Sequence, residues 1–352
     1  AKVNDLVAKA AREEMPALAI TDHGNMYGVP KFVQACKQQG VKPIIGQEFY
    51  LAGKSRHEKA TSKHADTPDD SANPTYHQIL WAKNEAGYRN IIKLSSMGFT
   101  EGYFRNPRID KELLAQYKEG LVCSTCCLAS EINQTILKKG PEKAEELFKW
   151  WLDLFGEDYY IELQRHGLKD QDYCNEVLMQ WAKKYPQVKV IATNDVHYVE
   201  EADSEAHDLL LALQTGSDYD DPNRFRFADD QNRLNPRFFF KTESEMQHLF
   251  QDVPQALENT LEIADKCVFE LAMTGDMMLP TFQIPEQFPD QDAYLEHLTW
   301  EGARRKYGEI SAELEERVRT ELRIIREKQY AGYFLIVQEF TNEARKRGVL
   351  VG

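Results

Sequence analysis

The segment Lys189-Val-Ile-Ala-Thr-Asn-Asp-Val-His-Tyr198 joins a short apolar run to a cluster of polar residues. The run from Lys189 to Thr193 contains β-branched residues and predicts a buried strand. Asp195 and His197 follow it, and side chains two residues apart point the same way in an extended chain. That arrangement suits two ligands of one metal ion. The pattern equally fits a loop in which Asp195 caps a helix starting near Glu201, so the segment alone favours neither interpretation.

Composition and charge narrow the class of protein. The chain has 352 residues and a net charge of −14, which fits one large domain or one domain and part of another. A surface built to hold duplex DNA alone normally carries a basic excess, so we do not expect the main nucleic-acid contact here. No apolar run approaches the roughly 18 residues of a membrane span, and Ala1 to Glu14 does not resemble a signal peptide. The 6 unevenly spaced cysteines indicate a reducing, cytoplasmic compartment.

A strand with a polar end, followed by a helix, recurs along the chain. Ala17 to Ile20 ends in Thr21-Asp22-His23-Gly24, and Lys42 to Tyr50 carries Glu48 near its end. Further strands are expected at Tyr76 to Ala82, Gly120 to Cys127 and Tyr159 to His166, with another helix beginning at Pro107 to Asp110. This recurrence predicts an α/β fold with parallel strands, and about half a dozen such units favour a barrel. In a barrel the carboxyl ends of the strands share the face that carries active sites.

The expected strand ends supply side chains that bind zinc, manganese or iron. Each alone has an ordinary explanation, such as helix capping, a satisfied buried histidine or a core thiol. Their repetition at similar positions favours a shared, polynuclear metal site, because carboxylates gathered on one face repel unless cations or protons relieve them. The candidate ligands are His23, Glu48, His77, Cys127, Asp195 and His197.

Three cysteines lie close together near the end of one expected strand. The Cys123-x-x-Cys126 spacing is a weak zinc or redox signal, because no second pair exists elsewhere in the sequence. Strand alternation places Cys123 and Cys127 on one face, with Cys127 at the open end. Cys127 is therefore the expected ligand.

Two segments are expected to lie outside the barrel. The polar stretch from Arg56 to Pro74 predicts a surface excursion whose deletion barely affects folding. The proline-punctuated stretch Leu279 to Pro285 indicates a boundary, and Asp290 to Arg305 and Ser311 to Lys328 predict amphipathic helices. We interpret these as solvated connecting helices rather than DNA contacts of Arg304, Arg305, Arg323 and Arg326.

Several motifs resemble the PHP (polymerase and histidinol phosphatase) domain of the bacterial replicative DNA polymerase III alpha subunits, a family of C-family polymerases. These motifs are Ile20 to Gly28, Ile45 to Tyr50, Ala82 to Asn84 with Gly87 to Asn90, Pro107 to Asp110, Ala192 to Tyr198, Ala206 to Leu210 with Gln214 to Gly216, and Gly332 to Val337. The resemblance covers essentially the whole chain. It implies an α/β fold with a PHP-type distorted (β/α)7 TIM-like barrel over residues 1–272. Residues 273–352 would form a helical segment leading into the polymerase palm.

The resemblance also implies roles for individual residues. His23, Glu48, His77, Cys127, Asp195 and His197 match the family's metal-ligand positions one for one. Asp22, Arg108 and His166 are further candidates for the site. The family's opening His-x-His motif is absent and the chain stops at Gly352, before the palm aspartates, so we expect an N-terminal fragment that cannot polymerise DNA by itself.

For the parent protein the resemblance implies template-directed DNA synthesis in bacterial chromosome replication. DNA, deoxynucleoside triphosphates, Mg²⁺, a sliding clamp and an exonuclease subunit would then be its partners. The PHP site would use Zn, Mn or Fe to hydrolyse phosphodiesters, as a 3′–5′ proofreading exonuclease. Two alternatives remain open, a stand-alone PHP phosphoesterase acting on a small phosphate and a non-catalytic scaffold for a replisome partner.

Overall fold

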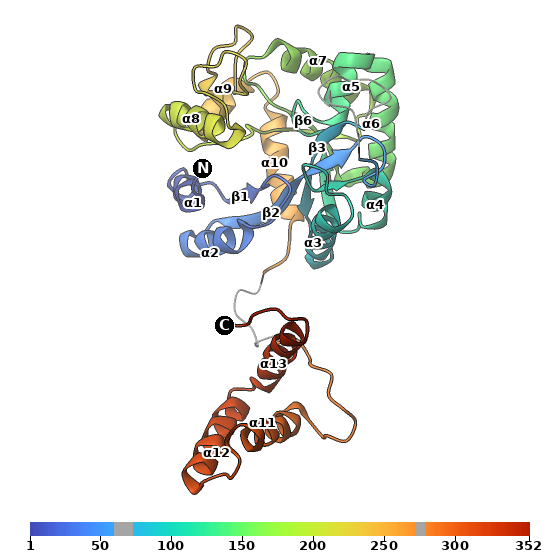
Figure 1. Cartoon of the computed structure of the whole chain (residues 1–352). Helices are drawn as coiled ribbons and strands as arrows, with labels where there is room; N and C mark the ends of the chain where they lie inside the picture. The colour runs from blue at the N-terminus through green and yellow to red at the C-terminus, as the bar shows by residue number, and fades with distance from the viewer. Residues whose placement is uncertain (60–72, 272–278) are drawn as a thin grey trace. The chain divides into compact units, whose positions relative to one another are not determined.

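The computed structural model describes residues 1–59, 73–271 and 279–352. The chain forms two compact units, Ala1–Met273 and Thr274–Gly352 (Figure 1). Each unit has its own hydrophobic core, so each is described by itself.

The first unit is built on a curved, mixed sheet (Figure 1). Its strands run in the order β1-β2-β3-β5-β6-β7, and β4 pairs with β2 beside this path. The strands are β1 (Ala17–Ile20), β2 (Lys42–Ala52), β3 (Thr75–Ala82), β4 (Arg108–Ile109), β5 (Leu121–Ser124), β6 (Tyr159–Leu163) and β7 (Lys189–Ala192). The sheet curls like half a barrel, so its inner face forms a concave surface.

The expectation of parallel strands throughout is wrong for β3. The pairs β1–β2, β2–β4, β5–β6 and β6–β7 are parallel, whereas β3 is antiparallel to both β2 and β5. Parallel neighbours need a long crossover, usually a helix, and no helix is described between β2 and β3. Because β3 is reversed, its beginning lies at the same edge as the later part of β2.

Helices α3 to α7 cover the outer side of the sheet (Figure 1). Their apolar faces meet the outward side chains of the strands in a core that includes Leu80, Leu94, Phe148, Trp151 and Leu178, all at most 1% exposed. The helices are α3 (Glu85–Thr100), α4 (Lys111–Gln116), α5 (Glu131–Lys139), α6 (Pro141–Phe155) and α7 (Lys169–Lys184).

Helix α10 (Gln255–Lys266) fills the concave side of the sheet. Its residues Ile263 and Ala264 pack with inward side chains from β2, β3, β5, β6 and β7, among them Ile44, Val122 and Ile191. Lys42 Nζ also donates a hydrogen bond to the Ala264 carbonyl. The interior below the candidate site is therefore a packed core rather than a channel.

The remaining elements of this unit lie around β1 and β7. Helices α1 (Val3–Arg12) and α2 (Val29–Gln39) share an apolar core with β1 that includes Val7, Phe32 and Ile45. After β7 come η2 (Glu201–Asp203), α8 (Ser204–Thr215), η3 (Pro236–Phe238) and α9 (Glu243–Leu249), and η1 (Gly156–Asp158) precedes β6.

Three expected elements have different bounds. Pro107 to Asp110 was expected to begin a helix, but Arg108–Ile109 form β4 and Asp110 caps α4 by accepting from the Leu113 N–H at 2.9 Å. The strands expected to reach Cys127 and His166 end earlier, at Ser124 and Leu163. After β5 the Thr125 N–H still donates to the Tyr160 carbonyl of β6, but the next N–H, that of Cys126, bonds to the Ser124 hydroxyl and the chain leaves the sheet. After β6 the His166 N–H bonds to the Gln171 side chain instead of a neighbouring strand.

The predicted excursion from Arg56 to Pro74 is wrong at both ends, and residues 60–72 lie outside the described residues. Arg56 is 8% exposed and its guanidinium lies 3.0 Å from an Asp110 carboxylate oxygen. Asn73 is 7% exposed, accepts from the Lys54 N–H and donates to the Ser55 and Glu58 carbonyls. A polar composition predicts exposure, but these polar groups find buried partners, so removing the whole stretch would break them.

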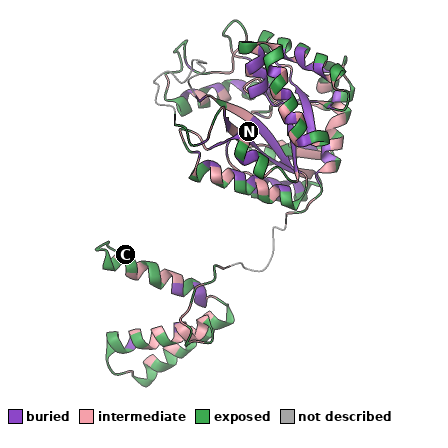
Figure 2. Cartoon of the chain, turned by 90° about the vertical axis from the view of Figure 1, so that its right-hand side faces the viewer, coloured by how far each residue is buried: buried purple, intermediate pink, exposed green. Residues whose placement is uncertain are grey.

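The second unit consists of α11 (Gln291–Tyr307), α12 (Ala312–Glu327) and α13 (Ala331–Lys346). Leu295, Ala331 and Leu335 form its small core, with Leu322 and Ile325 of α12 packed against it. No residue of α12 is buried, in contrast to the sheet of the first unit (Figure 2). Among the described residues, no helix is long and apolar enough to span a membrane.

Candidate metal centre

Three side chains from adjacent strands form the centre of the site. His23 lies just beyond β1, where it forms a bridge with Glu48, which sits in the middle of β2 rather than at its end. His77 lies near the start of the reversed strand β3. Glu48 Oε2 is 3.4 Å from His23 Nδ1, and Glu48 Oε1 is 2.8 Å from His77 Nδ1. Ligand atoms of all three lie within 4.8 Å of one another.

Cys127 joins this group from the loop after β5. Its Sγ lies 3.5 Å from Glu48 Oε1 and 3.6 Å from His77 Nδ1. The expectation that Cys123 shares its face is wrong, because Cys123 packs in the outer core while Cys127 belongs to the inner one. The strand ends at Ser124 and Cys126 takes a φ of 62°, so the alternation of the strand does not continue to Cys127.

Asp195 and His197 approach from the loop after β7. Asp195 has a φ of 45°, and its Oδ1 lies 3.7 Å from His197 Nδ1. His197 Nδ1 is also 2.8 Å from the Asp195 carbonyl oxygen, which can only accept, so this nitrogen carries the proton. The other ring nitrogen then has the lone pair that a cation needs. The His197 ring centroid lies 6.2 Å from that of His23, so both loops face the same space.

The buried groups of the site perturb one another's protonation. Burial alone would lower the pKa of His77, but its hydrogen bonds with Cys127 and Glu48 raise that pKa to about 10. Burial opposes ionisation of Glu48, yet the hydrogen bond from His77 and the nearby His23 hold its pKa below the ordinary value. In the metal-free chain a proton on His77 therefore offsets the Glu48 charge.

Asp195 carries the least well compensated charge of the site. Burial raises the pKa of its carboxyl to about 6, His197 opposes the shift, and Glu48 adds to it. A divalent cation between these groups would relieve the repulsion of the carboxylates. The donor set of imidazoles, carboxylates and one thiol fits zinc, iron or manganese, so the residues present suit a metal centre.

Two of the further candidates bond to the backbone of loops around the site. Asp22 Oδ2 accepts from the Gly28 N–H at 3.1 Å and closes the loop between β1 and α2. Arg108 is 1% exposed and donates to the carbonyls of Gly102, Arg56 and Glu58. Both therefore shape loops around the site.

His166 supports the Asp195 loop from behind. Its Nδ1 accepts from Gln171 Nε2 at 3.1 Å, so Nε2 carries the proton and donates to the Asn194 carbonyl at 3.0 Å. Burial lowers its pKa to about 4, which keeps the ring neutral at pH 7. Both ring nitrogens already have partners in the chain, so His166 orients the loop rather than offering a free ligand atom.

We expect His166→Phe to weaken metal binding by about 10- to 100-fold, the usual effect of losing a residue that orients a ligand. Phenylalanine keeps the stacking on Phe238, where the ring centroids are 3.9 Å apart, but cannot donate to Asn194. The Asn194 carbonyl would lose its hydrogen-bond donor while remaining buried, which should lower the unfolding free energy by about 1–3 kcal/mol. Metal titration with urea unfolding measures both effects. The exposed His248→Phe is the control, and equal metal affinity in both variants would refute the orienting role.

Glu162 is a residue that the sequence reasoning missed. It lies in β6, is 2% exposed, and accepts from Ser124 Oγ, Thr193 Oγ1 and Gln164 Nε2. Burial raises its pKa, and the charge of Asp195 adds to the shift. A glutamate inside an otherwise apolar strand was the available signal. Glu162 links the ends of β5, β6 and β7, and so fixes the loops that carry Cys127 and Asp195.

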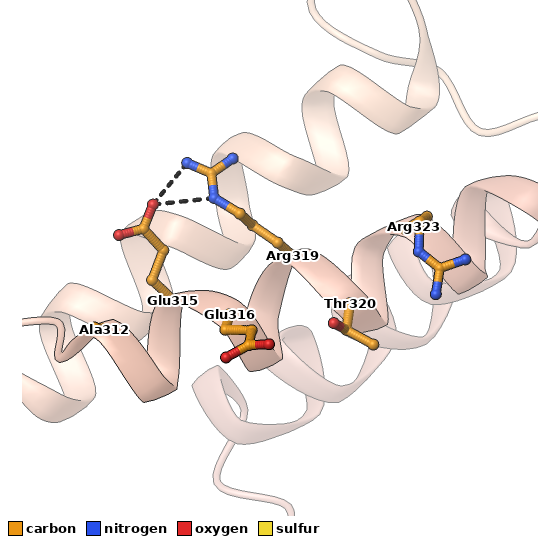
Figure 3. Close-up of a pocket in the computed structure, with 6 residues that line it drawn as sticks. All are labelled: Ala312, Glu315, Glu316, Arg319, Thr320 and Arg323. Atoms are coloured by element: carbon orange, nitrogen blue, oxygen red, sulfur yellow. Dashed lines mark hydrogen bonds and ion pairs between the residues drawn. The ribbon is translucent and has the colours of Figure 1, made fainter.

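The second unit carries a surface hollow of its own. One face of α12 lines it, with Glu315 bonded to Arg319, and with Glu316 and Arg323 nearby (Figure 3). Arg319 and Glu315 are both largely exposed, and Arg323 pairs with Glu327 at 2.7 Å. Such exposed pairs are typical of a solvated helix, so this hollow does not compete with the buried ligand cluster as a reaction site.

Comparison with known proteins gives the family of the chain. Residues 1–166 match the PHP domain, and residues 293–352 match the bacterial DNA polymerase III alpha NTPase domain. The DNA polymerase III subunit alpha of Borreliella burgdorferi is 41% identical over 353 residues, covering 100% of this chain and 30% of that protein. The chain belongs to the bacterial DNA polymerase III alpha subunit family. The PHP resemblance and the distorted TIM-like barrel are thereby confirmed.

Other members of this polymerase family match over a similar extent. The subunit alpha of Treponema pallidum is 38% identical, with 99% of this chain and 28% of that protein covered. That of Thermus aquaticus is 35% identical, with 100% of this chain and 33% of that protein covered. The chain thus spans about a third of the length of these DNA polymerase III alpha relatives.

Proposed function

We propose that this chain is the N-terminal part of a DNA polymerase III alpha subunit, with residues 1–272 as its PHP domain and residues 273–352 leading into the palm. The complete protein would perform template-directed DNA synthesis in the cytoplasm, using DNA, deoxynucleoside triphosphates and Mg²⁺. A sliding clamp and an exonuclease subunit are its proposed partners. The extended similarity to polymerase subunits over both units supports this proposal more than it supports a stand-alone phosphoesterase.

We further propose that the PHP domain is a metal-dependent phosphodiesterase, acting as a 3′–5′ exonuclease. The observation that carries this proposal is the cluster of Glu48, His77 and Cys127, joined at distances of 2.8 to 3.6 Å, with His23 beside them. Asp195 and His197 would complete the ligand set. A scaffold that binds no metal gains nothing from carboxylates and imidazoles held this close, because their repulsion and burial need a cation or protons to offset them.

The residues around such a metal site would have different roles. A bound metal supplies an activated water and polarises the phosphoryl oxygens. Glu48 and Asp195 would provide the negative charge that retains cations, and His23, His77 and His197 would provide neutral donors once any proton on His77 is displaced. Glu162 and His166 would hold the β5 and β7 loops, so that the ligands keep their positions.

The test is hydrolysis of a single-stranded oligonucleotide labelled at its 5′ end, with Zn²⁺, Mn²⁺ or Fe²⁺ added to the metal-depleted protein. We expect stepwise shortening from the 3′ end that depends on metal. His77→Gln should reduce the rate by at least about 100-fold, because it removes a donor bonded to Glu48. The exposed His297→Gln in the second unit is the control. Stoichiometric metal without any hydrolysis would instead favour a structural centre in a scaffold.

A further inference from the structure

Cys126 places a second thiol at the metal centre, beyond the residues that match the family's ligand positions. Ligand atoms of Glu48, Cys126 and Cys127 all lie within 4.8 Å of one another. All three side chains are buried, with Cys126 1% exposed, Glu48 4% and Cys127 7%. The two sulfurs and the carboxylate thus form a compact group inside the domain.

The loop after β5 turns this thiol inward. The Cys126 N–H donates to Ser124 Oγ at 3.1 Å, and Cys126 adopts a φ of 62°. Asn133 Nδ2 then donates to the carbonyls of Cys126 and Cys127, at 3.4 and 2.9 Å. These bonds hold both neighbouring cysteines on the inner side of the sheet, whereas Cys123 packs in the outer core.

We propose that Cys126 is an additional metal ligand, which together with Cys127 and Glu48 forms a sulfur-rich subsite selective for Zn²⁺ over Mn²⁺. This inference rests on the proposed metal centre. Thiolates favour zinc, whereas manganese prefers oxygen ligands, so a second sulfur ligand shifts the selectivity of the site towards zinc. Both thiols must lose their protons to solvent when the ion binds.

The distances are compatible with one ion. With Zn–S bonds of about 2.3 Å and Zn–O bonds of about 2.0–2.2 Å, ligand atoms on a tetrahedral zinc lie roughly 3.5–3.8 Å apart. The three donor atoms are separated by no more than 4.8 Å. Adjustments of about 1 Å therefore suffice, without any change in the backbone of β2 or of the loop after β5.

The experiment replaces the native metal of the full chain with Co²⁺ under reducing conditions and records the sulfur-to-cobalt charge-transfer band. We expect that band to fall by about half in Cys126→Ser and to vanish in the double Cys126→Ser, Cys127→Ser variant. Competition between Zn²⁺ and Mn²⁺, followed by metal analysis, should show a zinc preference at least 10-fold lower in Cys126→Ser. Cys123→Ser is the matched control, because Cys123 is equally buried three residues earlier, in β5, but packs in the outer core.

A second variant keeps the test valid if Cys126→Ser fails to fold. Cys126→Gly also removes the thiol, and glycine suits the positive φ of this position. A half-intensity band in Cys126→Gly supports the inference in the same way. In addition, the ¹¹³Cd spectrum of the unsubstituted protein distinguishes one cadmium–sulfur bond from two without any substitution.

The outcomes separate this inference from the proposed function. An unchanged cobalt band and zinc preference in folded Cys126→Gly would overturn the Cys126 assignment and leave the phosphodiesterase proposal standing. The cobalt band could instead depend on Cys126 in a protein that shows no phosphodiesterase activity. That result would support Cys126 as a metal ligand and contradict the proposed exonuclease function. A folded protein that binds no Co²⁺ or Zn²⁺ would overturn both.

Discussion

Asp195→Asn is expected to weaken metal binding at the PHP site by at least about 100-fold, more than the usual loss of a supporting residue. Asparagine keeps the size of the side chain but removes the charge that offsets a divalent cation. Any exonuclease activity should disappear with the metal, whereas DNA synthesis by the complete polymerase should persist. Metal analysis, exonuclease assays and primer extension measure these three effects.

The same substitution should stabilise the metal-free protein. The folded-state pKa of Asp195 is about 6, above the ordinary 3.8, so between these values the folded state binds more protons than the unfolded state. The contribution of Asp195 to the stability of the metal-free chain therefore falls as pH rises from about 4 to about 6. At pH 7 we expect Asp195→Asn to raise the unfolding free energy by about 1–3 kcal/mol.

The substitution should therefore stabilise the metal-free protein although it weakens metal binding. Urea unfolding with and without metal, at about pH 4 and pH 7, tests these opposite effects. The exposed Asp153→Asn should change neither metal content nor the pH dependence. Unchanged metal content in Asp195→Asn would defeat the ligand assignment. A folded variant that no longer extends primers would mean that the PHP site supports the palm directly.

Asp110→Ala is expected to lower the unfolding free energy of the first unit by about 3–5 kcal/mol, the usual cost of breaking a buried ion pair. Asp110 is 2% exposed, accepts from the Arg56 N–H at 2.9 Å and bonds the Arg56 guanidinium at 3.0 Å. It also caps α4 through the Leu113 N–H. Alanine removes both interactions and leaves Arg56 with Glu101 as its remaining carboxylate partner.

Asp110→Asn provides a matched comparison, because asparagine still caps a helix but carries no charge. Asp110→Asn should therefore lose less unfolding free energy than Asp110→Ala. The difference between the two variants measures the contribution of the helix cap, about 1 kcal/mol. Glu85→Gln, which breaks the exposed pair with Arg89, should cost less than about 0.5 kcal/mol. Chemical unfolding of each variant gives the values. A loss below about 1 kcal/mol in Asp110→Ala would show that the Arg56 end of segment 56–74 is not stabilised by its bonds to Asp110.

The sequence by itself determined the class of fold and the choice of candidate ligands. Apolar runs such as Lys189 to Ala192 fixed where strands lie, because side-chain periodicity and burial are local properties. Polar residues that closely follow these runs, such as His23 and Asp195, were then sufficient to predict that one face of the barrel carries the metal site. The family motifs added the PHP barrel, which the comparisons confirm.

Only the tertiary structure decided how the side chains meet. His77 lies near the beginning of its strand, and it reaches Glu48 only because β3 is antiparallel to β2. Cys126 and Cys127 turn inward because hydrogen bonds to Ser124 and Asn133 end the strand alternation. Strand direction, loop hydrogen bonds and buried partners depend on residues distant in sequence, so local patterns do not specify them. For the same reason the polar residue Arg56, expected at the surface, is buried beside Asp110.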